Sequence, residues 1–172
     1  MSAIFLSASV PLVGRGSYHE TANPFLIQCA VRELVMAVIR QHKIVWGGHP
    51  AITPMIWSIC EDLGVDYSGA VVLYQSTFFK DRYPEENDRF HNVVFTNAVA
   101  GDREASLLLM REEMLSRDDL VAAVFIGGME GVEAEHEEPV INFVCEAYHD
   151  PQEHVCQARR SCRPSFRPSP LS

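Results

Sequence analysis

Short apolar segments alternate with segments of helical periodicity along most of this chain, and the alternation restricts the fold more than any other feature. The apolar segments are rich in β-favouring residues and cover positions 3–10, 43–46, 70–74, 91–96 and 120–126. Helical spacing of apolar residues follows over 24–41, over 53–64 and after Asp102. Such alternation favours right-handed βαβ crossovers. We therefore predict an α/β fold with a doubly wound, mostly parallel, Rossmann-like sheet and helices on both faces.

Local signals mark the ends of these helices. Asn23 stands before Pro24, which combines a good N-cap with proline at the first helical position. Asp102 offers a second N-cap, and Gly64 is a natural helix end. Segment 120–126 is almost wholly apolar, as expected for a central parallel strand covered on both faces.

Three turns at the predicted carboxyl ends of the strands have a composition suited to phosphate. They contain Ser7 and Ser9, then Gly47, Gly48 and His49, and then Gly127, Gly128 and Gly131. Glycine lets backbone N–H groups approach an anion, and a following helix N-terminus adds a favourable dipole. Because ligands of doubly wound sheets bind beyond the carboxyl ends of the strands, we expect a binding pocket there.

The charge of the chain argues against nucleic acid as a partner. The net charge is −9, and the last fourteen residues hold four arginines and no acid, so residues 1–158 carry the other ten basic and all 23 acidic residues. Such a surface repels nucleic-acid backbones, although a few local donors can still hold a small phosphate ligand. We expect no nucleic-acid duplex as a partner.

Cysteine, histidine and hydropathy patterns point to a cytoplasmic protein without a metal. The five cysteines are an odd number and form no C-x-x-C pair, which signals neither a disulfide framework nor a zinc knuckle. The seven histidines match no standard zinc spacing. No stretch has the length of a membrane span, and the first residues lack the pattern of a signal peptide. We expect no metal, no cofactor and no membrane partner.

Two of the glycine turns resemble a known group of proteins. A strand ending in Gly127-Gly128, followed by a helix with Glu135, resembles the Pro-Gly-Gly-x-Gly-Thr-x-x-Glu signature of the Lonely Guy phosphoribohydrolases, which belong to the SLOG superfamily. The Gly47-Gly48 turn is similar to their Tyr-Gly-Gly-Gly segment, and closer still to SLOG domains associated with TIR proteins. Arg111 lies in the helix before the last strand, where the family places an arginine facing the pocket. The resemblance spans about residues 3–138.

The resemblance implies specific roles in a nucleotide pocket. Ser7 or Ser9, together with the turns at Gly47 and Gly127, would hold phosphate and ribose. Arg111 would supply positive charge and Glu135 would face the sugar. In the enzymes these two residues serve hydrolysis of an N-glycosidic bond, whereas the TIR-associated relatives sense ADP-ribose-type or other NAD-derived signals.

Departures from the enzyme signature favour binding over turnover. Ile126 stands where the signature has proline, Val132 stands where it has threonine, and the turn has one additional residue, which leaves Glu133 as a competitor of Glu135. These changes fall in the turn that would orient the sugar. We therefore expect a sensor of a nucleotide or an ADP-ribose-related or NAD-related derivative, with a nucleotide phosphoribohydrolase as the alternative. A homodimer or higher homo-oligomer, and an effector protein that receives the signal, are the expected macromolecular partners.

Several residues keep two interpretations at this point. Arg111 either faces the pocket or forms an exposed ion pair on its helix. His49 and His91 either contact the ligand or are structural. The charged segment 83–90 is either a lid over the ligand or a solvated excursion.

The division of the chain follows from its composition. Residues 1–150 are expected to form one nucleotide-binding domain. Residues 151–172 are rich in Arg, Ser and Pro and show no periodicity, which predicts an irregular or disordered basic tail.

Overall fold

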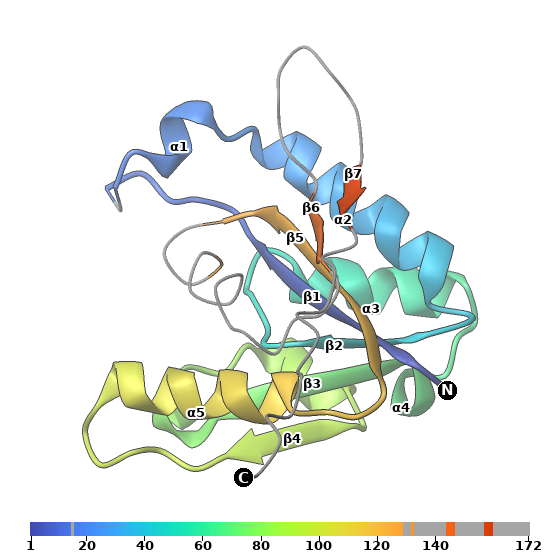
Figure 1. Ribbon diagram of the computed structural model, residues 1–172. Coiled ribbons are helices and arrows are strands. Elements are labelled where there is room, and N and C mark those ends of the chain that lie inside the picture. Colours follow the sequence, from blue (N-terminus) through green and yellow to red (C-terminus); the bar gives the residue numbers. More distant parts are fainter. Residues whose placement is uncertain (15, 129–131, 133–143, 147–156, 160–172) are drawn as a thin grey trace, which may run out of the picture.

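The predicted parallel sheet is present in the computed structural model, which describes residues 1–14, 16–128, 132, 144–146 and 157–159 (Figure 1). Seven strands lie in the order β4-β3-β2-β1-β5-β6-β7. Their bounds are β1 Ala3–Ser9, β2 Lys43–Trp46, β3 Val71–Ser76, β4 Val93–Thr96, β5 Leu120–Gly127, β6 Val144–Glu146 and β7 Gln157–Arg159. All neighbours pair in parallel except β6 and β7, which are antiparallel. The α/β Rossmann-like fold is thereby confirmed.

The order of the strands reverses direction at β1. The chain adds β2, β3 and β4 on one side of β1 and then returns to place β5 on the other side. Ser9 at the end of β1 lies opposite Gly127 at the end of β5. Such a reversal leaves a crevice at the carboxyl ends of the strands, where ligands of open α/β sheets bind.

Helices cover both faces of the sheet (Figure 1). The α-helices are α1 Tyr18–Thr21, α2 Pro24–Val38, α3 Thr53–Asp62, α4 Tyr67–Ala70 and α5 Arg103–Leu115, and two 3₁₀ helices, η1 Thr77–Arg82 and η2 Glu85–Arg89, connect β3 to β4. Ile4 and Leu6 of β1 pack in the core beneath α2 and α3, whereas Phe5 packs in a second core beneath α5. This alternation is the period of a strand buried on both faces.

The helix ends follow the signals in the sequence. Asn23 Oδ1 accepts hydrogen bonds from the backbone N–H groups of Phe25 at 3.0 Å and Leu26 at 3.2 Å, which confirms the N-cap of α2. Asp102 caps α5 by accepting from the Ala105 N–H at 3.0 Å. Each cap satisfies backbone donors that the first turn of a helix leaves without partners.

Two differences from the sequence prediction concern the route from β3 to β4. β3 continues to Ser76, two residues beyond the predicted end, so its final polar residues reach the carboxyl edge of the sheet. The following charged stretch forms η1 and η2 instead of an open loop. Capping of η1 by Ser76, whose Oγ accepts from the Phe78 N–H at 3.4 Å, supports this local structure.

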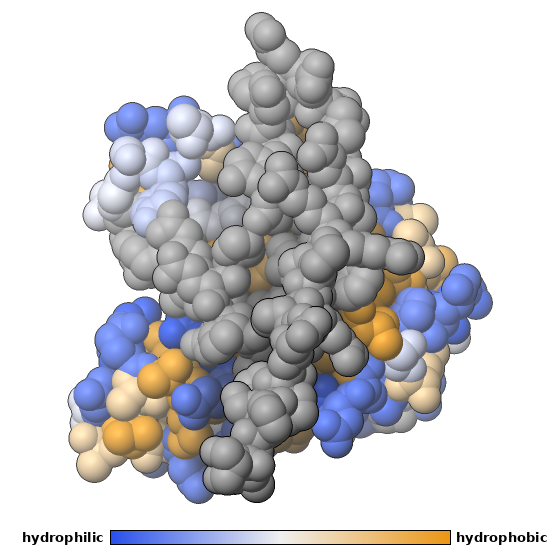
Figure 2. Space-filling model, viewed as in Figure 1, coloured by the Kyte–Doolittle hydropathy of each residue, from blue (hydrophilic) through white to orange (hydrophobic). Residues whose placement is uncertain are grey.

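Hydrophilic residues and some exposed hydrophobic residues share the surface of the protein. In the view of Figure 2, hydrophobic surface lies over α5, where Leu108 is 44% exposed. Within the described ranges, no helix has both the length and the hydropathy of a membrane span. β7 falls within the predicted tail 151–172, and the rest of that tail lies outside the described residues.

Candidate functional site

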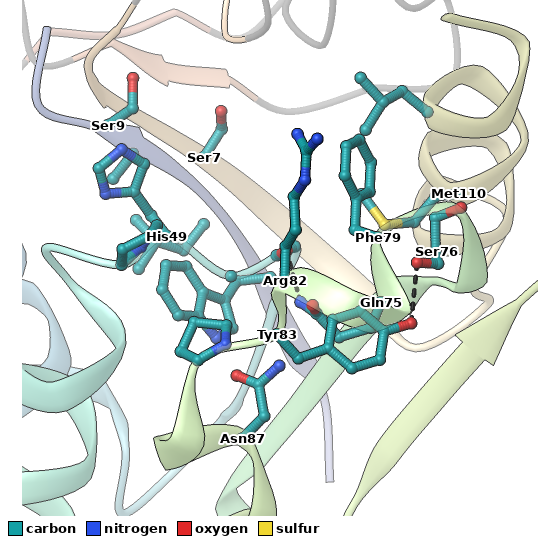
Figure 3. Close-up of a pocket in the computed structure, with 18 of the residues that line it drawn as sticks. Ser7, Ser9, His49, Gln75, Ser76, Phe79, Arg82, Tyr83, Asn87 and Met110 are labelled. Atoms are coloured by element: carbon teal, nitrogen blue, oxygen red, sulfur yellow. Dashed lines mark hydrogen bonds between the residues drawn. The ribbon is translucent and has the colours of Figure 1, made fainter. Parts of the chain in front are cut away.

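A cavity of about 380 Å³ opens at the carboxyl ends of β1, β2 and β3 (Figure 3). Its size falls in the usual range of small-molecule sites, roughly 300–1,000 Å³. Its described lining comes from the ends of three strands, from the β3–β4 connection and from α5. The polar lining residues are Ser7, Ser9, His49, Gln75, Ser76, Arg82, Tyr83, Asn87 and Arg103. The predicted position of the pocket therefore coincides with a cavity in the structure.

Ser7 and Ser9 enter the cavity wall from the last part of β1. They are two residues apart, so they share one face of the strand, and Figure 3 shows both hydroxyl groups on the same side of β1. Ser9 is only 8% exposed, and its Oγ has no hydrogen-bond partner among the described residues. The strand end thus presents a buried hydroxyl group that no described residue satisfies.

The Gly47-Gly48 turn is held against the end of β3 by Gln75. Gln75 Nε2 donates hydrogen bonds to the carbonyl oxygens of Gly47 at 2.9 Å and Tyr74 at 2.8 Å. Gly48 has φ +80°, and a Cβ at this position would lie 2.5 Å from Gln75 Nε2. Glycine is required here both for the left-handed backbone and for the close approach of Gln75.

His49 is fixed in one tautomer by its own turn. Its Nδ1 accepts a hydrogen bond from the Ala51 N–H at 3.2 Å, and Thr53 Oγ1 donates to the His49 carbonyl oxygen at 2.9 Å. Because Nδ1 is an acceptor, the ring proton of neutral His49 resides on Nε2. Burial lowers the pKa of His49 below its ordinary value. His49 therefore offers a neutral N–H donor to the cavity.

Segment 77–89 forms the opposite wall, so the interpretation of residues 83–90 as a solvated excursion is wrong. Phe79, Arg82, Tyr83 and Asn87 all line the cavity. The Tyr83 hydroxyl donates to the Ser76 carbonyl oxygen at 2.8 Å, which ties the junction of η1 and η2 to the end of β3. Burial raises the pKa of Tyr83, so this hydroxyl stays protonated at neutral pH.

The charge of the described lining is positive. Arg103 forms an ion pair with Glu104, whereas Arg82 forms no ion pair or hydrogen bond with any described residue. Figure 3 shows the Arg82 guanidinium extending between Ser7 and Phe79. No acidic side chain occurs among the described lining residues. Such a wall suits an anionic ligand.

Gly127 supports the site without lining the cavity. It has φ +63°, and a Cβ there would lie 2.8 Å from the Ser9 carbonyl oxygen and 2.6 Å from Ile27 Cδ1. Only glycine lets the end of β5 approach both β1 and α2 this closely. Gly128 also lies outside the described lining, next to Val132, which belongs to it.

Of the two predicted catalytic residues, Arg111 and Glu135, the structure describes only Arg111. Arg111 is 9% exposed within α5, so an exposed ion pair at this position is wrong, yet it does not line the cavity. Glu135 and Gly131 lie outside the described residues. His91 is exposed and is not part of the cavity lining.

Sequence reasoning missed Gln75, Arg82 and Asn87 as site residues. For Arg82 and Asn87, the available signal was the composition of segment 77–90, in which aromatic residues border charged residues between two strands. Among the described residues, no group of three or more His, Cys, Asp or Glu side chains could hold a metal ion.

Fold and cavity together define a Rossmann-like α/β domain with a cavity of small-molecule size at the carboxyl ends of β1, β2 and β3. The comparison with protein families agrees: the model of the SLOG cluster3 family matches residues 17–142, and the chain belongs to this family. This match covers the larger part of the chain and confirms the predicted SLOG resemblance. No curated protein and no solved structure matches the chain significantly.

Proposed function

We propose that this protein binds a nucleotide or a nucleotide derivative related to ADP-ribose or NAD, and that the bound state acts as a signal. The observation that carries the proposal is the Arg82 guanidinium, which has no partner among the described residues and extends between Ser7 and Phe79 in Figure 3, in a cavity whose described lining has no acid. An arginine without an ion-pair partner can bind phosphate through two parallel hydrogen bonds. Membership in the SLOG cluster3 family supports a nucleotide-related role.

The remaining lining offers groups for the other parts of such a ligand. Ser9 Oγ and the Nε2–H of His49 are neutral donors suited to phosphate oxygens or ribose hydroxyls. Phe79 and Tyr83 contribute aromatic surface on which a base can stack. The cavity thus combines one cationic group, neutral polar groups and ring surfaces.

Binding is proposed in preference to hydrolysis because Ile126 and Val132 depart from the enzyme signature in the turn that would orient the sugar. Cleavage of an N-glycosidic bond through the predicted mechanism requires a carboxylate beside the anomeric carbon, to stabilise an oxocarbenium-like transition state or to position water. Release of a free base by the purified protein would show that hydrolysis takes place instead.

We further propose that the ligand-bound protein acts on an effector protein and assembles as a homodimer or higher homo-oligomer. The apolar surface over α5, which includes exposed Leu108, offers an area for such contacts (Figure 2). Sedimentation velocity with and without ligand measures whether assembly occurs and whether binding changes it.

The first experiment is a calorimetric titration of the protein with AMP, ADP-ribose, cyclic ADP-ribose and NAD, with chromatography of each mixture for released base. For whichever ligand binds, Arg82→Ala is expected to weaken affinity about 10- to 100-fold, because charge-assisted hydrogen bonds to phosphate are lost. The free energy of unfolding should change by less than about 0.5 kcal/mol, since this side chain is exposed.

Arg32→Ala is the matched control. Arg32 lies on α2 outside the cavity lining, and its side chain is exposed beside Glu33 at 3.9 Å. The substitution removes the same charge, so it reproduces any effect of net charge alone. Equal losses in the two variants, or no binding of any nucleotide by the unmodified protein, would contradict the proposed function.

A further inference from the structure

Buried polar atoms without partners gather at the cavity. The described residues include six buried side-chain nitrogen or oxygen atoms that lack a hydrogen-bond partner, and four of them belong to the lining residues Ser9, Trp46 and Asn87. Native proteins pair nearly all such atoms, because burial without a hydrogen bond is unfavourable. Their concentration at one cavity indicates that its wall is adapted to hydrogen bonds with a bound molecule.

Asn87 is the most informative of the three residues. It is 6% exposed, and both its Nδ2 and its Oδ1 lack partners. The backbone around it is fixed, because the Asn87 N–H donates to the Pro84 carbonyl oxygen at 3.0 Å and the Asn87 carbonyl oxygen accepts from the Phe90 N–H at 3.1 Å. Figure 3 shows its amide pointing up from η2 toward Tyr83. A fixed backbone thus presents one donor group and one acceptor group side by side.

We propose that the Asn87 amide determines ligand specificity by reading a ring edge that carries a hydrogen-bond donor beside an acceptor. The inference rests on the proposed function and defines the ligand more narrowly. The amino group and adjacent ring nitrogen of adenine form such an edge, which asparagine pairs with in two parallel hydrogen bonds. The carboxamide of nicotinamide offers the same pair of groups.

Trp46 supports this assignment from the end of β2. Its side chain is 1% exposed, it belongs to the cavity lining, and its indole Nε1–H has no partner among the described residues. An indole nitrogen can only donate, so it complements an acceptor on the ligand. Trp46 therefore adds to the cavity wall a second buried polar group that has no partner among the described residues.

A purely structural role for the amide predicts a different response to substitution. An asparagine that holds the fold through hydrogen bonds loses stability when replaced by leucine, whereas an unpartnered amide can be replaced by an apolar group of similar shape at little or no loss. We therefore expect Asn87→Leu to melt at the same temperature as the unmodified protein or higher, and to bind ligand more weakly. Asn87→Ala is the second variant, because it removes the amide without placing a larger side chain in the cavity wall.

The test compares two pairs of ligands, in each of which one member lacks the hydrogen-bond donor. AMP is paired with purine riboside 5′-monophosphate, which lacks the amino group, and nicotinamide mononucleotide is paired with nicotinic acid mononucleotide, which lacks the amide. The unmodified protein should prefer the amino-bearing or amide-bearing member of one pair by about tenfold or more. Both Asn87 variants should lose this preference. The pair that shows it identifies the ring.

Asn97→Leu is the control, because Asn97 is exposed and lies outside the cavity lining. This variant should keep both its affinity for nucleotides and its preference within each pair of ligands. If the unmodified protein binds nucleotides but the Asn87 variants retain the same preference, the inference fails while the proposed function stands. If the melting temperature of both Asn87 variants falls by several degrees without ligand, the amide stabilises the free protein through a buried water. This result would overturn the inference. If none of the four binds although ADP-ribose or NAD does, the inference fails; if no nucleotide binds at all, the proposed function fails as well.

Discussion

The two walls of the cavity differ in how the protein holds them. The strand-end wall, made of Ser7, Ser9, Gly47, Gly48 and His49, is fixed by sheet register and by turns with internal hydrogen bonds. The connector wall, made of Phe79, Arg82, Tyr83 and Asn87, carries side chains whose polar atoms are largely not used by the described protein.

Under the proposed function, this difference means that one wall supplies the frame of the site and the other wall is expected to supply its selectivity. Substitutions in or beneath the strand-end wall should lower stability first and affinity as a consequence. Arg82 and Asn87 of the connector wall should change affinity without much effect on stability, because few contacts of the free protein depend on them.

The largest expected effect follows from Gly127→Ala beneath the strand-end wall. The new Cβ would lie 2.8 Å from the Ser9 carbonyl oxygen on a backbone with φ +63°. Left-handed strain and the displacement of β1 together should lower the free energy of unfolding by about 3 kcal/mol or more, measured by urea denaturation.

Gly64→Ala separates these two causes. Gly64 has φ +60°, but nothing lies within 4 Å of a Cβ placed there. This variant should lose only the part due to backbone strain, about 1 kcal/mol. Equal losses in the two variants would mean that close contact at Gly127 does not shape the strand-end wall.

A smaller loss is expected for Gln75→Leu, which releases the Gly47-Gly48 turn. The substitution removes the hydrogen bonds that Gln75 donates to the carbonyl oxygens of Gly47 and Tyr74. Unfolding free energy should fall by about 1–3 kcal/mol, and affinity should fall with it. Gln75→Glu, which keeps the shape but cannot donate, should give a comparable loss. An unchanged stability in both variants would show that the turn holds its shape alone.

The pH dependence of stability should reveal the neutral state of His49. Because burial lowers its pKa in the folded protein, the unfolded chain takes up the proton first as pH falls below about 6.5. The stability that depends on neutral His49 is therefore complete above that pH and is lost as pH falls toward the lowered pKa. Urea denaturation from pH 7.5 to 5 measures this decline.

His49→Asn is the comparison variant for this experiment. An asparagine Oδ1 can accept the Ala51 N–H in place of Nδ1, as in an Asx turn, and it does not titrate. The variant should decline less steeply than the unmodified protein over the same pH range. Identical slopes would contradict the assignment of a buried neutral imidazole in the strand-end wall.

The smallest effect is expected from Tyr83→Phe in the connector wall. It removes the hydroxyl that donates to the Ser76 carbonyl oxygen at 2.8 Å and keeps the ring beside Phe95, with centroids 5.8 Å apart. Stability should fall by about 0.5–1.5 kcal/mol, as seen by thermal denaturation. A loss above about 3 kcal/mol would indicate that the connector wall is as much a part of the frame as the strand ends.

The fold was predictable because its signals are local. Apolar runs such as 43–46 coincide with β2, and the caps at Asn23 and Asp102 act within four residues of themselves. The strand-end wall was predictable for the same reason, since residues that follow parallel strands gather at one edge. The connector wall was not, because its polar composition is shared by loops that never approach a ligand.

Arg111 illustrates the limit of inference from resemblance. Helical periodicity places it on α5, but its burial depends on which faces of α5 and the sheet meet. A helix rotated by one residue would expose it, and no local signal determines that rotation.

The sequence by itself determined the class of the fold, the order of most elements and the strand ends that frame the cavity, because these depend on periodicity, caps and glycine turns. Only the tertiary structure decided that η1 and η2 line the cavity beside those strand ends, that Arg82 belongs to its wall and that the amide of Asn87 is buried without a partner among the described residues. The physical reason is that burial and the pairing of polar atoms depend on segments far apart in the chain, which local propensities do not encode.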